Sequence, residues 1–328
     1  MLLLKPQFWD KKQDTIFSII LIPLSIIYYL LIFFKEKLVK QNKFGISIIC
    51  VGNIYIGGTG KTISAIEIFK IISKYKKTCF LTKGYGRKTS KDFFLYKKNT
   101  KKYTTDQIGD ESFLLNQFGP TYVSYNRKKA INIIKDKGFE AIILDDGFQD
   151  KSIFKDINFL CFDSENWIGN GRLLPSGPLR ECLKSIKEAN YVIIKGNKNQ
   201  KIENSLKKIN NKIKFFYLEN KIKNLNKYKK NNFIAFAGIG SPKSFFKILK
   251  NNNIKVVKEY IYPDHYNFKK DDYTFLFKQS INNHCKLITT EKDFMRIKSS
   301  YKNKLFFIKL INKIINNNIL EKEIKNIL

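Results

Sequence analysis

A glycine-rich turn between an apolar strand and a helix constrains the fold of this chain more than any other segment. The apolar run Ile46–Val51 leads into the turn, and Ile63–Tyr75 has helical spacing after it. The turn itself reads Gly57-Gly58-Thr59-Gly60-Lys61-Thr62. Backbone N–H groups in such a turn point at anionic oxygens, and the helix N-terminus adds positive partial charge. The segment therefore predicts a phosphate-binding loop in an α/β protein.

The last two residues of this turn have the chemistry of a nucleotide site. Lys61 can reach the β- and γ-phosphates of ATP, and the Thr62 hydroxyl can bind Mg²⁺. The usual pattern has glycine five residues before Gly60, where this chain has Tyr55. A glycine turn that only joins a strand to a helix is therefore the competing interpretation, and other motifs must decide between them.

The formal net charge of +33 suggests a nucleic-acid partner, but the kind of basic residue argues against it. Lysine is spread along the chain together with abundant Asn, Ile and Phe, a pattern typical of AT-rich codons. We therefore expect no specific nucleic-acid partner. Arginine is scarce, so a retained arginine indicates a need for a planar, bidentate donor to phosphate or carboxylate. The arginines are Arg87, Arg127, Arg172, Arg180 and Arg296.

The cysteines favour a reducing compartment. Five cysteines are scattered along the chain without Cys-x-x-Cys spacing. They are expected to be reduced and mostly buried, because neither a disulfide framework nor a zinc site has this spacing.

An uncharged, almost wholly apolar stretch at Thr15–Phe34 predicts a membrane helix within an N-terminal anchor, residues 1–40. A helix of about 20 residues is about 30 Å long, close to the thickness of the hydrocarbon core. The lysines that follow would keep its C-terminal end cytoplasmic, and no small-residue cleavage site indicates a signal peptide. Pro23 can kink the helix, so shallow insertion competes with a full span. A buried core helix is a third interpretation.

The remainder of the chain alternates apolar strands with helices, which predicts parallel sheets covered by helices. The expected strands of the first part are Thr78–Thr82, Thr121–Ser124, Glu140–Leu144, Asn158–Phe162 and Tyr191–Ile194. A Lys/Asn-rich stretch, about 200–232, has little pattern, so we place a boundary there. A second series of strands follows at Phe233–Ala237, Lys255–Tyr260 and Leu287–Thr289. We expect two α/β/α domains, 41–222 with a P-loop NTPase-like parallel sheet and a smaller one at 223–328.

Several acidic residues and one histidine are candidates for the chemistry. Asp145 and Asp146 end an apolar strand, where a carboxylate can organise Mg²⁺ opposite a phosphate loop. Two solvated turn aspartates are the alternative. Asp110 opens a helix and could simply be a capping residue. Paired with His265 from the second domain, however, it could take a proton from a hydroxyl nucleophile.

Three of the five arginines lie in two short glycine-containing loops, which favours recognition of an anion over chance. The first loop contains Tyr85 and Arg87 between glycines. The second, Gly171–Glu181, contains Arg172 and Arg180. Ordinary solvated loops are the alternative reading.

In order and spacing, these segments together resemble the tetraacyldisaccharide 4′-kinase (lipid A 4′-kinase) family, from the apolar helix to about Arg296. The resemblance rests on Val51–Asn53 with the glycine loop, Gly84–Arg87, Gly109–Glu111, Asp145–Gln149, Leu173–Glu181, Ala237–Gly240, Asp264-His265 and Thr290–Asp293. The family's loop also lacks the first glycine, so Tyr55 fits. Where the family often has histidine, this chain has Asp150, which leaves the role of that position open.

The resemblance implies an activity and a set of roles. The family transfers the ATP γ-phosphate to the 4′-hydroxyl of a tetraacylated glucosamine disaccharide 1-phosphate, at the cytoplasmic face of the bacterial inner membrane. It implies ATP and Mg²⁺ as cofactors, the lipid A precursor and inner-membrane lipid as partners, and a smaller domain that closes the active-site cleft. We expect a monomer.

Carried over to this chain, the implied roles are as follows. Gly57, Gly58, Thr59, Gly60, Lys61, Thr62 and Arg180 would bind ATP, with Lys61 also catalytic. Asp110 would be the base and His265 its partner, and Tyr85 and Arg87 would contact the disaccharide or its phosphate. Thr62, Asp145, Asp146 and Glu181 would surround the metal. The alternative function is a membrane-associated P-loop ATPase or GTPase switch with no lipid acceptor.

Overall fold

The chain forms two compact units in a computed structural model that describes residues 6–11, 13, 15–96, 102–239, 242–263, 266 and 268–328. The first unit comprises residues 1–219 and 312–328, and the second comprises residues 220–311. Placing 312–328 with the first unit differs from the sequence-based boundary, which assigned all residues after 222 to the second domain. Strands β8 and β13 connect the two units.

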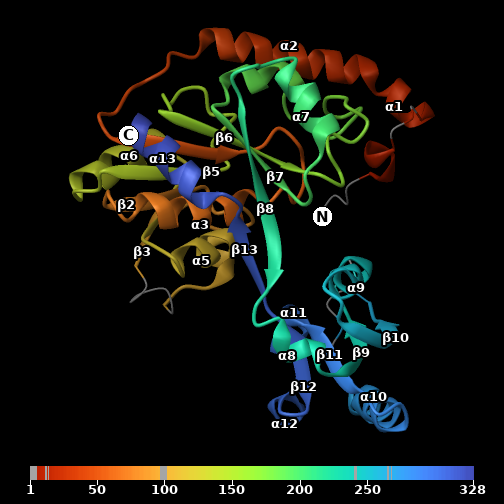
Figure 1. Cartoon of the computed structure of the whole chain (residues 1–328). Helices are drawn as coiled ribbons and strands as arrows, with labels where there is room; N and C mark the ends of the chain where they lie inside the picture. The colour runs from red at the N-terminus through yellow and green to blue at the C-terminus, as the bar shows by residue number, and fades with distance from the viewer. Residues whose placement is uncertain are drawn as a thin grey trace. The chain divides into compact units, whose positions relative to one another are not determined.

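The first unit is built on a mostly parallel sheet with strand order β13-β8-β7-β6-β1-β5-β2-β4-β3 (Figure 1). Pairing is parallel from β8 to β4, and the short β3 is antiparallel to β4. The strands are β1 (Ser47–Gly52), β2 (Thr78–Thr82), β3 (Phe93–Leu95), β4 (Thr121–Val123), β5 (Ala141–Asp145), β6 (Ile157–Asp163), β7 (Tyr191–Lys195), β8 (Lys214–Ile222) and β13 (Leu310–Ile314).

Two hydrophobic cores cover the two faces of this sheet. Successive strand residues point to opposite faces, so Ile49 and Val51 of β1 join one core whereas Ile48 and Cys50 join the other. The first core includes helices α3, α5 and α13, and the second includes α6 and α7. The helices are α3 (Lys61–Ile72), α4 (Thr105–Ile108), α5 (Asp110–Asn116), α6 (Arg127–Asp136), η3 (Leu183–Glu188), α7 (Gln200–Lys207) and α13 (Asn317–Ile327).

The N-terminal apolar stretch forms two helices rather than one. After η1 (Gln7–Asp10), α1 (Ile16–Ile20) and α2 (Ile22–Leu38) are separated at Leu21. Pro23 lies in the first turn of α2, where its missing N–H costs no helix hydrogen bond. The expectation of one continuous helix over 15–34 is therefore wrong. Among the described residues, no helix combines the length and the apolar character needed to cross a membrane.

The second unit has a smaller, entirely parallel sheet with strand order β10-β9-β11-β12. Its strands are β9 (Asn232–Ala237), β10 (Lys255–Ile261), β11 (Lys286–Thr290) and β12 (Leu305–Ile308). Its helices are α8 (Asn226–Lys229), α9 (Pro242–Asn251), α10 (Lys270–Asn282), α11 (Glu291–Arg296) and α12 (Ser299–Lys302). Both units are therefore α/β structures with parallel sheets.

Every strand expected from the sequence is present, with its ends shifted by one residue at most. The Lys/Asn-rich stretch, in contrast, contains α7 and β8, which the sequence did not indicate. In β8 the apolar run at residues 215–218 is short and is flanked by lysine, glutamate and asparagine, so the composition of the stretch hides the strand. Pairing with β7 provides the backbone hydrogen bonds that define it.

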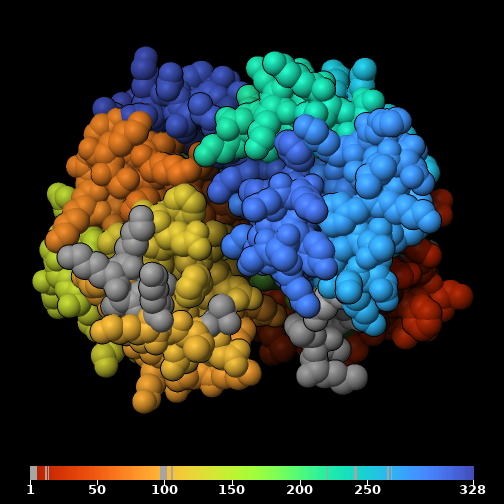
Figure 2. All heavy atoms as spheres, turned by 90° about the horizontal axis from the view of Figure 1, so that it is seen from below, coloured from red at the N-terminus to blue at the C-terminus, as the bar shows by residue number. Residues whose placement is uncertain are grey.

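The C-terminal helix α13 packs on α3 of the first unit. Leu320 and Ile324 of α13 are buried in the same core as α3, and Lys74 pairs with Glu321 at 2.7 Å. Figure 2 shows the C-terminal segment, in dark blue, directly beside the orange segment that contains α3. This contact is the reason that residues 312–328 belong to the first unit.

Replacing Leu320 by alanine should lower the free energy of unfolding of the first unit by about 2–5 kcal/mol, because it leaves a cavity between α13 and α3. The matched control is Ile319→Ala, since Ile319 is 54% exposed whereas Leu320 is fully buried. Urea denaturation followed by circular dichroism measures both. Equal effects of the two substitutions would contradict the described packing of α13.

Candidate active site

Three neighbouring strands of the first sheet end at the same edge, and a polar residue or loop with functional chemistry lies at or just after each end. Strand β5 lies between β1 and β2 and is parallel to both. The glycine loop follows β1, Asp145 ends β5, and Lys83 follows β2. In α/β proteins ligands bind beyond the carboxyl ends of the strands. The site therefore lies where this fold class predicts one.

The glycine loop has the backbone conformation that its glycines allow. Gly57 has a φ of 143° and Gly60 a φ of 83°, both in the region that favours glycine. Gly60 precedes α3, so Lys61 is the first residue of the helix and Thr62 the second. The free N–H groups of this helix end and of the loop are available to an anion.

Tyr55, which replaces the usual first glycine, is buried and structural. Its hydroxyl donates to Asp10 Oδ1 at 2.8 Å. The main chain on either side of it pairs with the Gly171–Glu181 loop. The Ile56 amide donates to the Pro178 carbonyl at 2.8 Å, and the Arg180 amide donates to the Ile54 carbonyl at 2.7 Å. These bonds join the glycine loop to the segment that carries Arg180.

A buried amide supports the same loop from inside. Asn53 donates through Nδ2 to Thr59 Oγ1 at 2.9 Å and is fully buried. Gln149 donates to the Asn53 carbonyl at 2.8 Å. Two residues of the family-like motifs, Asn53 and Gln149, therefore hold the phosphate loop in shape.

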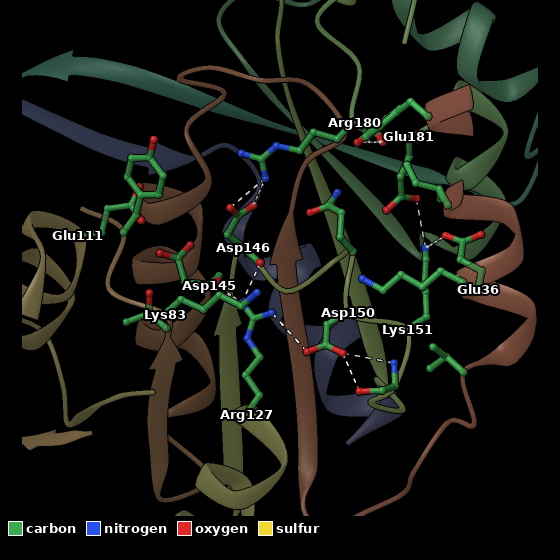
Figure 3. A pocket seen from close by; sticks show the side chains of 18 residues that line it. Glu36, Lys83, Glu111, Arg127, Asp145, Asp146, Asp150, Lys151, Arg180 and Glu181 are labelled. Carbon is green, nitrogen blue, oxygen red and sulfur yellow. Dashed lines mark hydrogen bonds and ion pairs between the residues drawn. The ribbon is translucent and has the colours of Figure 1, made fainter. Parts of the chain in front are cut away.

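Two cations converge on Asp146, from segments far apart in the sequence. Nη1 of Arg180 lies 3.0 Å from both carboxylate oxygens (Figure 3). Nζ of Lys61 lies 3.8 Å from Oδ1. Thr62 Oγ1 lies 3.4 Å from Oδ2 of the neighbouring Asp145. The glycine loop, the end of β5 and the arginine loop therefore meet at one point.

The two adjacent aspartates have opposite pKa shifts. Burial raises the pKa of Asp145 to about 7, and the charges of Glu111 and Asp146 act in the same direction. Burial would also raise the pKa of Asp146, but Lys61 and Arg180 outweigh it and lower that pKa. Asp145 is 1% exposed, and its Oδ1 has no hydrogen-bond partner among the described residues.

Arg127 holds the turn that carries this pair. Asp146 has a φ of 54°, which is unusual for a residue other than glycine. Arg127 Nη2 donates to the carbonyl of Asp145 at 3.2 Å and to that of Asp146 at 2.8 Å. Its Nη1 lies 3.5 Å from Asp150 Oδ2. Asp150, which differs from the family's usual histidine, thus neutralises the arginine beneath the acidic turn.

A cavity of about 610 Å³ opens beside these residues. Of the residues to which the sequence assigned a role in the site, it is lined by Tyr85, Asp145, Asp146, Arg180 and Glu181 (Figure 3). One wall is formed by α2 and the residue that follows it, through Tyr28, Ile32, Lys35, Glu36 and Val39. The cavity therefore lies between the carboxyl edge of the sheet and the N-terminal apolar helix.

Glu181 lies deep in the wall and is joined to α2 through a lysine. Lys151 Nζ lies 3.2 Å from Glu181 Oε2, 3.8 Å from Glu36 Oε1 and 2.7 Å from Glu188 Oε2. Burial raises the pKa of Glu181 in spite of Lys151, and Oε1 of Glu181 has no hydrogen-bond partner among the described residues.

The remaining candidates are placed less simply. Asp110 is exposed at the first position of α5 and is not among the lining residues, whereas the next residue, Glu111, lines the cavity. Tyr85 is 79% exposed at the rim. Arg87 is buried, and its guanidinium lies over the Tyr125 ring at 4.0 Å and donates to the Lys91 carbonyl. His265 lies outside the described residues.

Sequence reasoning missed several charged residues of the cavity, among them Lys83, Glu111, Arg127 and Lys151. A signal existed for Arg127, because arginine is rare in this chain. Burial lowers the pKa of Lys83, with the charge of Arg127 adding to the effect. No comparable signal marked the lysines, since lysine occurs along the whole sequence.

Comparison with known proteins identifies the family. A family model described as "LpxK: Tetraacyldisaccharide-1-P 4'-kinase" matches residues 17–328. The tetraacyldisaccharide 4'-kinase of Pelagibacter ubique is 39% identical over 313 residues, covering 94% of this chain and 93% of the relative. That of Rickettsia canadensis is 35% identical over 299 residues, covering 90% and 88%.

A solved structure agrees with the sequence comparison. The "apo" form of LpxK from Aquifex aeolicus in complex with ATP has 27% sequence identity and a TM-score of 0.70. The alignment covers 94% of this chain and 99% of the Aquifex chain. With a glycine loop, an acidic strand end and an arginine loop in one place, this chain belongs to the tetraacyldisaccharide-1-P 4'-kinase family.

Proposed function

We propose that this protein transfers the γ-phosphate of ATP to the 4′-hydroxyl of tetraacyldisaccharide 1-phosphate, in lipid A synthesis at the cytoplasmic face of the inner membrane. The observation that carries the proposal is the convergence of Lys61 and Arg180 on Asp146 beside the glycine loop. Membership of the family supports the acceptor, and the complex of the Aquifex LpxK with ATP supports the donor.

The donor half of the site is the glycine loop with its two cations. The backbone N–H groups of Gly57–Thr62 hold the phosphates, and Lys61 and Arg180 neutralise their charge. Phosphoryl transfer needs in-line positioning and charge neutralisation more than covalent help from the protein. Both cations lie within 4 Å of one carboxylate, which holds them beside the glycine loop.

The residues present fit Mg²⁺, a hard cation that binds oxygen ligands. Asp145 has a buried oxygen without a hydrogen-bond partner among the described residues, and the Thr62 hydroxyl lies beside it. These two residues, with Asp146 and Glu181 around them, would hold Mg²⁺, which when bound neutralises the β- and γ-phosphates. Within the part of the chain that the structure describes, no cluster of three or more His, Cys, Asp or Glu is arranged as a metal site.

The acceptor half needs a base for the 4′-hydroxyl proton. As the new bond forms between the 4′-oxygen and the γ-phosphorus, the bond to the β,γ-bridging oxygen breaks and ADP leaves. The hydroxyl proton passes to the carboxylate of Asp110, with His265 as its partner. Tyr85 at the rim contacts the disaccharide, whereas the buried ring contact of Arg87 favours a supporting role for that residue.

Three regions divide this work. Residues 1–40 anchor the protein, residues 41–219 together with 312–328 contain the kinase site, and residues 220–311 form the smaller domain, which carries His265 and closes the cleft on substrate binding. The exposed side chains of α1 and α2 are almost all apolar and include Phe17, Leu31 and Phe34. This face enters the bilayer shallowly, which brings the cavity wall formed by α2 to a substrate whose acyl chains stay in the membrane.

The purified protein should transfer label from γ-labelled ATP to tetraacyldisaccharide 1-phosphate. Asp110→Asn should lower turnover by about 10²–10⁴-fold at an unchanged ATP affinity, because it removes the general base. Thin-layer chromatography of the lipid measures turnover, and calorimetry measures ATP affinity.

The matched control is Asp106→Asn, which alters an exposed aspartate of α4 that pairs only with Lys88 among the described contacts. The Glu111→Gln variant distinguishes the roles of the two neighbouring acids, Asp110 and Glu111. If it abolishes turnover while Asp110→Asn does not, the base is Glu111. If labelled free phosphate accumulates while the lipid stays unlabelled, the ATPase-switch function replaces the proposed kinase function.

The buried Asp145 should make stability fall as pH rises. Its pKa is about 7 in the fold and about 3.9 when unfolded, so the folded state binds more protons between these values. The stabilisation is complete below about pH 4 and is lost as pH rises through 7, by about 4 kcal/mol at most. Asp145→Asn should flatten this slope, as measured by urea denaturation from pH 4.5 to 8 without metal.

Asp150→Asn is the control for this titration. The pKa of Asp150 is lowered, because Ser152 and Arg127 outweigh its burial, so its stabilisation is lost only at lower pH. The slope between pH 5 and 8 should therefore persist in Asp150→Asn. A slope that is unchanged in Asp145→Asn would rule out the raised pKa.

The exposed apolar face of α2 should control binding to lipid. Leu31 and Phe34 are 65% and 58% exposed, and replacing both by serine should weaken binding to phosphatidylethanolamine–phosphatidylglycerol vesicles by about tenfold or more. The control replaces Ile281 and Phe275, two exposed apolar residues of α10, by serine. Cosedimentation with the vesicles measures binding. An equal loss of vesicle binding in both double variants would argue against a specific anchor.

A further inference from the structure

Up to Phe34, helix α2 has its polar side chains, Ser25 and Tyr28, on the protein side, and its exposed side chains are apolar or aromatic. Ser25 is buried, and Ser18 of α1 and Tyr28 lie on the same inward stripe, at helical spacing. The surrounding positions, such as Leu24 and Ile27, are more than half exposed. Because a water-soluble helix has the opposite arrangement, the polar stripe needs its own explanation.

The polar stripe is hydrogen-bonded to the arginine loop. Ser25 Oγ donates to the Leu173 carbonyl at 3.0 Å and accepts from the Ser176 amide at 3.0 Å. Ser176 Oγ donates to the Ser18 carbonyl at 2.6 Å. These bonds attach α1 and α2 to Leu173 and Ser176, in the part of the loop that precedes Arg180.

Tyr28 attaches the same helix to Arg180 itself. Its hydroxyl donates to the Arg180 carbonyl at 3.0 Å. On the other side, the Arg180 amide donates to the Ile54 carbonyl of the phosphate loop at 2.7 Å. The main chain of Arg180 is therefore held between α2 and the phosphate loop, while its guanidinium pairs with Asp146.

The next residue has a parallel attachment. Glu36 of α2 reaches Lys151, which also lies 3.2 Å from Glu181. Two consecutive residues of the site are thus connected to two places on α2, Arg180 directly and Glu181 through one lysine. The helix that carries the exposed apolar face also sets the wall of the cavity.

We propose that Tyr28 is a positioning residue that holds Arg180 in register with the phosphate loop and so couples the lipid-facing helix α2 to the ATP site. The inference rests on the proposed kinase function. Tyr28 reaches the ATP site through Arg180, because its hydroxyl donates to the Arg180 carbonyl. Burial, with the charge of Glu181, raises the pKa of Tyr28, so the hydroxyl keeps the proton that it donates.

Tyr28→Phe tests the proposal, because it removes one hydroxyl and leaves the ring and the serine contacts in place. A neutral hydrogen bond of this kind corresponds to about a three- to tenfold change. We expect kcat/KM for ATP to fall by that factor, the calorimetric Kd for ATP to rise similarly, and binding to vesicles to stay unchanged.

The matched control is Tyr228→Phe, which removes a hydroxyl that donates to the Phe307 carbonyl at 2.9 Å in the second unit. It should affect thermal stability but not the constants for ATP. If Tyr28→Phe likewise lowers only thermal stability, Tyr28 is structural and the proposal is wrong.

A double-mutant cycle shows whether Tyr28 acts through Arg180. In the Arg180→Ala background, Tyr28→Phe should change the Kd for ATP by less than about twofold, because the guanidinium that Tyr28 positions is absent. Independent, multiplicative losses would overturn the proposal. The calorimetric Kd needs no lipid acceptor, so failure of the coupling is distinguishable from failure of the kinase function.

Discussion

The carboxylate of Asp146 is the contact on which the arrangement of the site depends. It receives Lys61 from the start of α3 and Arg180 from a loop more than a hundred residues away. Without this anion, two cations would lie close together at the mouth of the sheet, with a Coulomb cost that low dielectric increases. Beneath it, Arg127 donates to the carbonyls of the turn and is itself neutralised by Asp150. Negative and positive groups therefore follow one another through the site, from Asp150 to Arg127, then to Asp146 and finally to Arg180.

This alternation explains why the adjacent Asp145 differs so much from Asp146. Asp146 has two cations within 4 Å, whereas Asp145 is enclosed by the sheet and meets the Thr62 hydroxyl. One carboxylate is thus ionised and paired, and the other is buried with an oxygen that lacks a partner among the described residues. A hard cation or a phosphate-bound metal is the kind of group that completes such a pair.

The N-terminal helices connect this charge network to the outer surface. Their inward stripe donates to and accepts from the main chain of the arginine loop, and their exposed side chains up to Phe34 are apolar or aromatic. The polar side chains of the stripe form hydrogen bonds to the arginine loop, and the apolar side chains therefore face outward. An apolar run in the sequence is compatible with a core helix, a spanning helix or this arrangement. The hydrogen bonds of Ser25 and Tyr28 distinguish them.

The sequence by itself determined the local elements and the chemistry of their ends. Strand positions followed from apolar runs, the phosphate loop from its glycines, and the acidic strand end from Asp145 and Asp146. Strand β8 was not predicted, because its apolar run, residues 215–218, is short and lies in a Lys/Asn-rich stretch, and its backbone hydrogen bonds come from pairing with β7. Only the tertiary structure decided that Arg180 pairs with Asp146 while Arg87 stacks on Tyr125, and that Glu111 rather than Asp110 lines the cavity. Those outcomes depend on contacts between distant segments, and a side chain's partner across such a distance is set by packing rather than by its neighbours in sequence.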